Sequence, residues 1–368
     1  MTTTPPPAGP APQHPADPYA YAPPPQSPAP PYAPHSPYGW YGPRPPHVPQ
    51  VPYVAPPLPY HRLALVTGRH QWWRPLAGTG LVLVGAVAAA VAVLVGGEIA
   101  GGILGRPTGD DGFQVWGGIG ETAQALLSLA LLLPVVFMAA RWVQRRPQGT
   151  VSSVAGRLRW GWLVRCGLVA LPLVAGSLGV MMLLPDAGGT GTEGTEWAGL
   201  GDFLLGLAVV CVLVPFQAAA EEYVFRGWLT QAVGAWCRSP WLAILPQAPL
   251  FAAAHGWGTP WGFADLVVFA LVAGVLTIRT GGLEAAIGLH VLNNLLAMGV
   301  SAAIAGALAS DETAADMPWT SVCVDVVMLC GYAAVVLWLA RRRGIRSVSV
   351  GAEAGVGASA GAGAGAGR

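Results

Sequence analysis

The sequence predicts an all-α fold, a polytopic transmembrane helix bundle of about eight spans with both termini in the cytoplasm. Hydrophobic residues make up 53% of its 368 positions and charged residues only 10%, which is too apolar for an average soluble domain. Long apolar runs recur from residue 76 onward, with arginines and acids in alternate loops. We therefore expect a multi-pass protein of the cell (cytoplasmic) membrane, surrounded by the lipid bilayer. The net charge is only +1, so no nucleic-acid partner is expected.

Composition divides the chain into four regions. The first is a Pro/Tyr-rich leader, with 23 of the 35 prolines in residues 1–60. We expect it to be disordered and cytoplasmic, either as a ligand for a proline-recognising partner or as a solvated spacer. The four regions are the leader (1–70), a three-span region with an external loop (71–200), a motif-bearing membrane core (201–342) and a disordered Gly/Ala-rich tail (343–368).

Eight apolar runs are candidate membrane spans. Most approach the length of about 20 residues that a helix needs to cross a bilayer. The fifth and sixth are short, so we expect them to be tilted or buried inside the bundle. The runs lie at about residues 76–104, 119–140, 161–184, 203–225, 241–256, 262–279, 284–307 and 320–340.

The placement of arginine predicts the orientation of these spans. Arginines collect before the first span, between the second and third, and after the fourth, sixth and eighth. The alternate loops carry mainly acids, such as Asp186, Glu193 and Glu196. Cytoplasmic loops of membrane proteins are enriched in basic residues, so both termini are expected to face the cytoplasm.

The segment QAAAEEYVFRG, residues 217–227, places charged groups at the end of an apolar run. Residues 203–220 contain no basic or acidic side chain, and then Glu221, Glu222 and Arg226 follow. A charged residue at the centre of a membrane helix costs about 2.5–3.5 kcal/mol on insertion scales, so such residues are candidates for function. Glu222 and Arg226 stand four apart and can pair along one helix face, which leaves Glu221, about 100° round the helix, to point elsewhere.

Two further pairs with the same spacing lie in later apolar segments. Phe251 and His255 are four residues apart, as are His290 and Asn294. After residue 70 the chain has no other histidine, and its only other asparagine is Asn293. Each pair alone is compatible with an interfacial position or with polar packing between helices. Their occurrence together favours a shared site.

The spacing of the helices indicates which of these residues can meet. The fourth and fifth spans form a hairpin that turns near residue 238, and Glu221 and His255 are both 17 residues from that point. They are therefore expected at similar height. His290 lies about eight residues beyond the turn at 280–282, which places it lower unless the hairpin projects into the cytoplasm.

A carboxylate and an imidazole that converge in a partly dry cavity can deprotonate a water molecule. Glu221 would act as the general base with His255, while His290 and Asn294 would donate hydrogen bonds to the oxyanion formed at an attacked carbonyl. That chemistry hydrolyses a peptide bond without a covalent intermediate. The same Glu221, His255 and His290 are also ordinary zinc ligands, so a metal-activated water is the alternative. The HExxH motif of zincins is absent from the sequence.

The order Glu-Glu-x-x-x-Arg, Phe-x-x-x-His and His-x-x-x-Asn on successive apolar segments resembles the CPBP family. These are the CAAX-processing and bacteriocin-processing (Abi) intramembrane endopeptidases, described both as metallopeptidases and as glutamate-type peptidases. The resemblance covers residues 200–300 as motifs and 76–340 as topology. It implies cleavage of a membrane-associated peptide or protein, with a divalent metal such as zinc as a candidate cofactor. The implied catalytic residues are Glu221, Glu222, Arg226, His255, His290 and Asn294.

Two other classes of function compete with a peptidase. A non-catalytic membrane scaffold or self-immunity protein would retain the fold and bind a partner through the leader. A transporter is disfavoured because the halves lack a matching pair of Gly/Pro-interrupted spans. Nothing in the sequence specifies a prenyl pocket, so a CAAX protein, another peptide, a bacteriocin leader or a regulatory membrane protein fits equally well.

Overall fold

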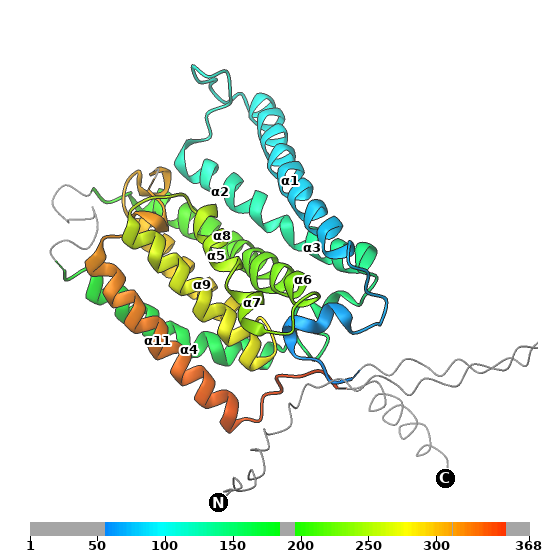
Figure 1. Cartoon of the computed structure of the whole chain (residues 1–368). Coiled ribbons are helices and arrows are strands. Elements are labelled where there is room, and N and C mark those ends of the chain that lie inside the picture. The colour runs from blue at the N-terminus through cyan, green and yellow to red at the C-terminus, as the bar shows by residue number, and fades with distance from the viewer. Residues whose placement is uncertain (1–55, 185–195, 311, 351–368) are drawn as a thin grey trace, which may run out of the picture. The chain divides into compact units, whose positions relative to one another are not determined.

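The computed structural model describes residues 56–184, 196–310 and 312–350, which form helices and connecting loops without a β-strand among them (Figure 1). The predicted all-α class is therefore confirmed. The α-helices are α1 (Arg74–Leu104), α2 (Gly117–Ala130), α3 (Leu132–Met138), α4 (Trp160–Met181), α5 (Leu200–Glu222), α6 (Thr230–Gly234), α7 (Pro240–Ile244), α8 (Gln247–Ala254), α9 (Pro260–Thr280), α10 (Glu284–Ala303) and α11 (Trp319–Arg342). Short 3-10 helices (η1, Tyr60–Leu65; η3, Gln148–Thr150; η5, Ala307–Ala309; η6, Ala314–Asp316) and π-helical turns (η2, Ala139–Val143; η4, Tyr223–Leu229) complete the set.

Seven helical stretches in the described part of the chain are long and apolar enough to cross a membrane. The protein is thus a multi-pass membrane protein, and seven of the eight expected spans are long enough to cross a bilayer. The run predicted as the fifth span is the shorter apolar stretch Pro240–Ala254, which is divided into α7 and α8 around Pro246. Its 15 residues reach about 22 Å as a helix, less than the hydrocarbon thickness of about 30 Å. The seven stretches are Arg74–Leu104, Gly117–Val143, Trp160–Met181, Leu200–Gly234, Pro260–Thr280, Glu284–Ala303 and Trp319–Arg342.

Consecutive loops lie at opposite ends of the bundle, and every second loop lies at the same end, as the distribution of arginine predicts. At one end the amide of Val154 donates to the carbonyl of Gly281 at 2.8 Å. At the other the amide of Thr259 donates to the carbonyl of Ala315, also at 2.8 Å. The assignment of the first end to the cytoplasm stays a prediction. We call it the arginine-bearing end; it consists of residues 56–73, 144–159, 235–239, 281–283 and 343–350.

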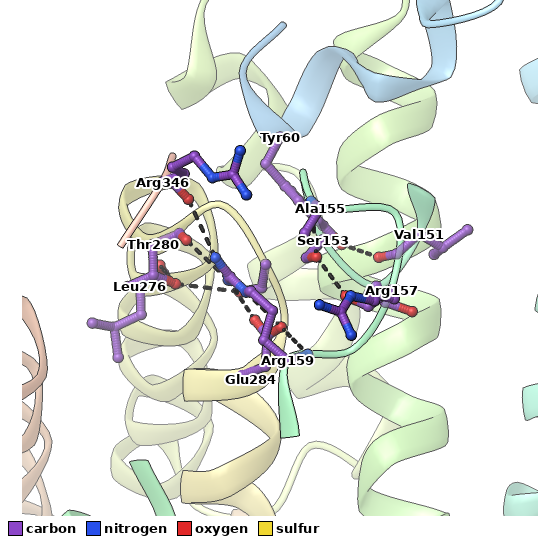
Figure 2. A network of polar contacts seen from close by, with 12 residues as sticks. Tyr60, Val151, Ser153, Ala155, Arg157, Arg159, Leu276, Thr280, Glu284 and Arg346 are labelled. Carbon is purple, nitrogen blue, oxygen red and sulfur yellow. Dashed lines mark hydrogen bonds and ion pairs between the residues drawn. The ribbon is translucent and has the colours of Figure 1, made fainter. Parts of the chain in front are cut away.

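A buried ion pair organises the arginine-bearing end (Figure 2). Both carboxylate oxygens of Glu284, the first residue of α10, accept hydrogen bonds from the Arg159 guanidinium, at 2.8 and 2.6 Å. The same guanidinium also donates to the carbonyls of Thr280 at 3.0 Å and Arg346 at 3.2 Å. This side chain therefore joins the start of α4, the end of α9, the start of α10 and the segment after α11.

The segments next to the two tails are ordered and pair with each other. The 3-10 helix Tyr60–Leu65 packs on α6, and Tyr60 is completely buried with its hydroxyl donating to the carbonyl of Val151. The amide of Ser349 donates to the carbonyl of Leu58 at 2.9 Å. The expectation of disorder through residue 70 and from residue 343 is therefore wrong for these segments, because their apolar side chains and backbone groups find partners in the bundle. The rest of both tails lies outside the described residues.

Helix α10 packs against α4, α5 and α9 in the motif-bearing half. Helix α1 lies at one edge against α2 and α3 (Figure 1). Helix α5 continues through the π-helical turn into α6 as one stretch of 35 residues. At 1.5 Å per residue it is about 52 Å long, well beyond the hydrocarbon thickness of about 30 Å. This stretch is therefore longer than the hydrocarbon layer is thick, so part of it is tilted or lies outside that layer.

Gly234, the last residue of α6, permits the close approach of the 3-10 helix. A Cβ atom at this position would lie 1.9 Å from the carbonyl oxygen of His61. No side chain fits into that distance without a shift of the backbone on one side of the contact. The glycine is therefore required by packing against Tyr60–Leu65 and not by its own backbone conformation.

We expect Gly234→Ala to displace the 3-10 helix and to lower the free energy of unfolding by about 1–3 kcal/mol, the usual range for overpacking. Trypsin cleaves after arginine, so faster cleavage at Arg62 in the purified protein reports the displacement. Gly331→Ala, in α11, is the matched control, because a Cβ atom there meets nothing within 4 Å. Equal cleavage rates at Arg62 in both variants would contradict the assigned role of Gly234.

Candidate active site

The site begins where the apolar helix α5 reaches its last turn. Glu221 and Glu222 end this helix, and the backbone continues without a break into the π-helical turn Tyr223–Leu229, which carries Arg226. Both carboxylates and the guanidinium are buried. The π-helical turn adds a residue to one helical turn, a distortion that is frequent at functional sites.

Glu222 holds together two helices of the site. Its Oε1 atom lies 3.1 Å from Nη1 of Arg226, which confirms the predicted pair, and it accepts a hydrogen bond from Nδ1 of His290 at 2.7 Å. The Arg226 guanidinium also stacks on Phe251, 4.0 Å from the ring centroid, in cation–π geometry. The contact between Glu222 and His290 was not predicted. It docks α5 against α10 through a charge that water does not reach.

Glu221 points away from this pair, as its position on the helix requires. Its Oε1 atom accepts a hydrogen bond from Nε2 of Gln217 at 2.6 Å, and Nδ2 of Asn294 donates to Oε1 of Gln217 at 3.2 Å. The two amides form a relay from α10 to the carboxylate. Sequence reasoning assigned no role to Gln217, although its spacing of four residues from Glu221 in an apolar run places both on one helix face.

The second carboxylate oxygen of Glu221 faces both histidines. Oε2 is buried without a hydrogen-bond partner and lies 3.8 Å from Nε2 of His255 and 3.7 Å from Nε2 of His290. Nδ1 of His255 lies 2.9 Å from the carbonyl oxygen of Phe251, which can only accept, so this nitrogen carries the hydrogen. Nδ1 of His290 is engaged in the same way by the carboxylate of Glu222. In their neutral forms both imidazoles therefore present the lone pair of Nε2 to Glu221.

With both imidazoles neutral, three lone pairs face this point and need a hydrogen-bond donor or a cation between them. A water molecule donates to two of them, and a proton on Nε2 of His290 turns the third into a donor to the water oxygen. Ligands of a tetrahedral zinc ion, at about 2.0–2.1 Å from the metal, are about 3.3 Å apart. The separations of 3.7 and 3.8 Å are wider than that, and no group of three or more His, Cys, Asp or Glu in the described ranges is arranged to hold a metal ion. A water oxygen at about 2.8 Å from each atom fits these separations. The site therefore fits a water molecule better than zinc, and the predicted metalloprotease is not supported.

The position between Oε2 of Glu221 and the two imidazoles is nearest to solvent on the side of His255. Its side chain is 23% exposed, whereas those of Glu221 and His290 are nearly buried. His255 follows the last residue of α8, and Gly256 then adopts a φ of +98°, which turns the chain out of the helix. The end of a short helix thus brings a partly exposed imidazole next to the buried carboxylate of Glu221.

The structure brings together all six residues that the sequence predicted. Two of them lie at the end of α5, one in the π-helical turn that follows, and one directly after α8. The other two lie in α10. Asn294 joins the others through Gln217 and does not touch Glu221 directly. The six residues are Glu221, Glu222, Arg226, His255, His290 and Asn294.

Known proteins share this segment of the chain. The sequence profile of the type II CAAX prenyl endopeptidase Rce1-like family matches residues 201–296, which contain all six site residues. A Bacillus subtilis (strain 168) protein with the name Uncharacterized protein YyaK is 30% identical over 171 residues, which is 44% of this chain and 55% of that protein. An Escherichia coli protein, Uncharacterized 24.3 kDa protein, is 32% identical over 168 residues, 44% of this chain and 72% of that protein.

The match to these relatives is partial in length. The chain spans just over half of the Bacillus subtilis protein and nearly three quarters of the Escherichia coli protein. No solved structure matches the chain. The profile match, the extent of the second relative and the meeting of the three motifs at one pocket agree with one another. By these criteria the chain belongs to the type II CAAX prenyl endopeptidase Rce1-like family.

Proposed function

We propose that this protein is an integral-membrane endopeptidase that hydrolyses a peptide bond of a membrane-associated peptide or protein with a water molecule activated by Glu221 and His255. The observation that carries the proposal is the convergence of Glu221 Oε2 with Nε2 of His255 and of His290, at 3.8 and 3.7 Å, where the His255 side chain is 23% exposed. The family match supports a CAAX protease type of activity. The number of apolar helices and the arginine distribution support a place in the cytoplasmic membrane.

The charges around the water suggest where the protons reside. Glu221 and Glu222 contribute two negative charges and Arg226 one positive charge, all in a dry environment. The proposed scheme places a second proton on Nε2 of His290, so that Arg226 and His290 balance the two carboxylates, because burial of uncompensated charge is costly.

In the proposed reaction the water lies between Glu221 and His255. Glu221 Oε2 takes one proton from the water, and Nε2 of His255 accepts a hydrogen bond from the other, so that an oxygen lone pair points at the substrate carbonyl. Attack on the carbonyl carbon forms a tetrahedral oxyanion. The proton held by Glu221 then passes to the leaving nitrogen, the C–N bond breaks, and a carboxylic acid and an amine result.

The oxyanion is stabilised by α10. The protonated Nε2 of His290 donates one hydrogen bond, while its Nδ1–H remains bound to Glu222. The amide of Asn294 donates the second, because only one of its two hydrogens is needed for Gln217. Glu222 and Arg226 do not touch the reacting atoms in this scheme. They position His290 and keep its positive charge balanced.

We expect Glu221→Gln to lower the turnover of a membrane-tethered peptide by about 10²- to 10⁴-fold, the usual contribution of a general base. The amide preserves the shape of the side chain, so expression and thermal unfolding should not change. Glu121→Gln is the matched control, since it makes the same substitution at an exposed acid of α2. Cleavage is measured with purified protein in lipid vesicles and a fluorogenic peptide, in prenylated and unprenylated forms.

Full activity of Glu221→Gln in that assay would reject the proposed mechanism. A cellular phenotype that survives Glu221→Gln and disappears on deletion of residues 1–55 would instead identify a non-catalytic scaffold or self-immunity protein. Comparison of peptides in membranes from cells that express the wild type or Glu221→Gln identifies the natural substrate. A product that depends on prenylation assigns the CAAX class.

The oxyanion role of Asn294 has a neighbouring control residue. Asn294→Ala should lower kcat by about 10²- to 10³-fold with little effect on KM, as for other oxyanion donors. Asn293→Ala removes the same group one position earlier, about 100° round the helix, and should leave kcat within about twofold. The two asparagines would have equal effects if they only joined α10 to its neighbours.

Removal of metal should leave the reaction intact. Because the separations at Glu221 fit a water molecule, dialysis of the purified protein against EDTA and 1,10-phenanthroline is expected to preserve the cleavage rate. A catalytic zinc site would hold about one zinc ion per chain, and element analysis of the same sample should find far less than that. Loss of activity on chelation, with recovery on addition of zinc, would establish a metallopeptidase in place of the proposed glutamate peptidase.

A further inference from the structure

Residues 60–74 and the distant turn between α6 and α7 bring basic side chains together at the arginine-bearing end. Nε2 of His61, in the 3-10 helix, lies 2.9 Å from the carbonyl oxygen of Arg238, in the turn between α6 and α7. Nε1 of Trp236, at the same turn, donates to the carbonyl of Trp72 at 3.1 Å, just before α1. Figure 1 shows the 3-10 helix in blue on the side of the bundle where α6 and α7 lie. The segments before α1 are thus attached to the hairpin that carries the active-site carboxylates.

The basic side chains on these segments lie near enough for their charges to affect one another, and one nitrogen of Arg74, Nη1, donates to the carbonyl of Arg69 at 2.7 Å. Burial and then the charge of Arg238 lower the pKa of Arg62. Burial, Arg74 and Arg62, in that order, lower the pKa of His70. In the described part of the chain none of these four side chains takes part in an ion pair with a carboxylate. Nε of Arg62 and Nε of Arg74 are buried without hydrogen-bond partners.

Their position coincides with the expected edge of the bilayer. Arg74 is the first residue of a membrane-spanning helix. Trp72 and Trp236 present 71% and 46% of their surface to the surroundings, side by side next to the basic groups. Tryptophan is enriched at the level of the lipid headgroups, where one part of the ring is in contact with acyl chains and the N–H with polar groups.

We propose that Arg62, His70, Arg74 and Arg238 form a binding site for the phosphate-bearing headgroup of an anionic phospholipid. The guanidinium groups match phosphate oxygens in geometry and charge, and no acid in the described part of the chain forms an ion pair with them. The exposed indoles of Trp72 and Trp236 add a surface for the glycerol and the first acyl carbons, which a free phosphate ion would not contact. The lipid would link the 3-10 helix and the start of α1 to the α6–α7 turn. It would thereby hold in place the hairpin on which Glu221 and His255 lie.

The test is the thermal unfolding of the purified full chain in a neutral detergent, titrated with phosphatidylglycerol. A lipid that binds only the folded protein raises the unfolding midpoint, by about 3 °C at tenfold excess over its dissociation constant. We expect this rise for the wild type. In Arg62→Gln/Arg238→Gln the loss of two charges should weaken the affinity by about 30-fold and remove most of the rise.

Three controls identify the source of the effect. Arg341→Gln/Arg343→Gln removes the same charge from exposed residues at the same end, outside the cluster, and should respond like the wild type. Phosphatidylcholine and inorganic phosphate should each give no rise. Arg238→Gln alone, at an exposed turn position, should give an intermediate rise and covers the case in which the double variant does not fold.

The proposal is overturned if the Arg62→Gln/Arg238→Gln protein responds to phosphatidylglycerol as the wild type does, or, where that variant does not fold, if Arg238→Gln does so. It is also overturned if Arg341→Gln/Arg343→Gln loses the response equally, since the effect would then come from general positive charge. A full response to phosphatidylcholine would show that the headgroup charge is not recognised. A full response to inorganic phosphate would show an anion site without a role for lipid.

Discussion

The carboxylate of Glu222 is the constraint on which the arrangement of the site depends. An ion in a dry interior costs several kcal/mol, and a carboxylate in that position is stable only with partners of good geometry. Glu222 has two, Arg226 on its own helix and His290 on α10. The contact with His290 sets the relative height of α5 and α10. Once it is made, the preceding residue, Glu221, is directed about 100° away and faces the pocket.

Helix α10 is held by two buried acids from two directions. At its first residue Glu284 is bound by Arg159 from α4, and six residues later His290 is bound by Glu222 from α5. Six residues correspond to about 9 Å along the axis and about 240° of net rotation, so the two contacts fix both translation and rotation. Asn294 is one turn further along the same helix, so the two contacts also fix its position. A catalytic helix that cannot slide or rotate keeps its hydrogen-bond donors aimed at one point, which is the requirement for stabilising a transient negative charge.

Local periodicity accounts for what the sequence predicts correctly. The spacing of four residues predicts the contact between Glu222 and Arg226, and equal distances from a hairpin turn predict that Glu221 and His255 meet. The relation of His290 to Glu222 depends on the register between two helices, which no local pattern contains. Arg159 and Glu284 stand 125 residues apart, so no local pattern predicts their pairing. The broken fifth span and the ordered segment around Tyr60 were missed because apolar length and proline content describe composition and not contacts.

The pairing of Leu58 with Ser349 joins positions separated by 291 residues. During translation residue 58 leaves the ribosome long before residue 349 exists, so this contact is among the last that the chain can form. The segment around Leu58 therefore completes its set of partners only after α11 has been inserted. The pairing of Leu58 with Ser349 can therefore form only when synthesis has reached residue 349, and a chain that ends before that residue lacks it.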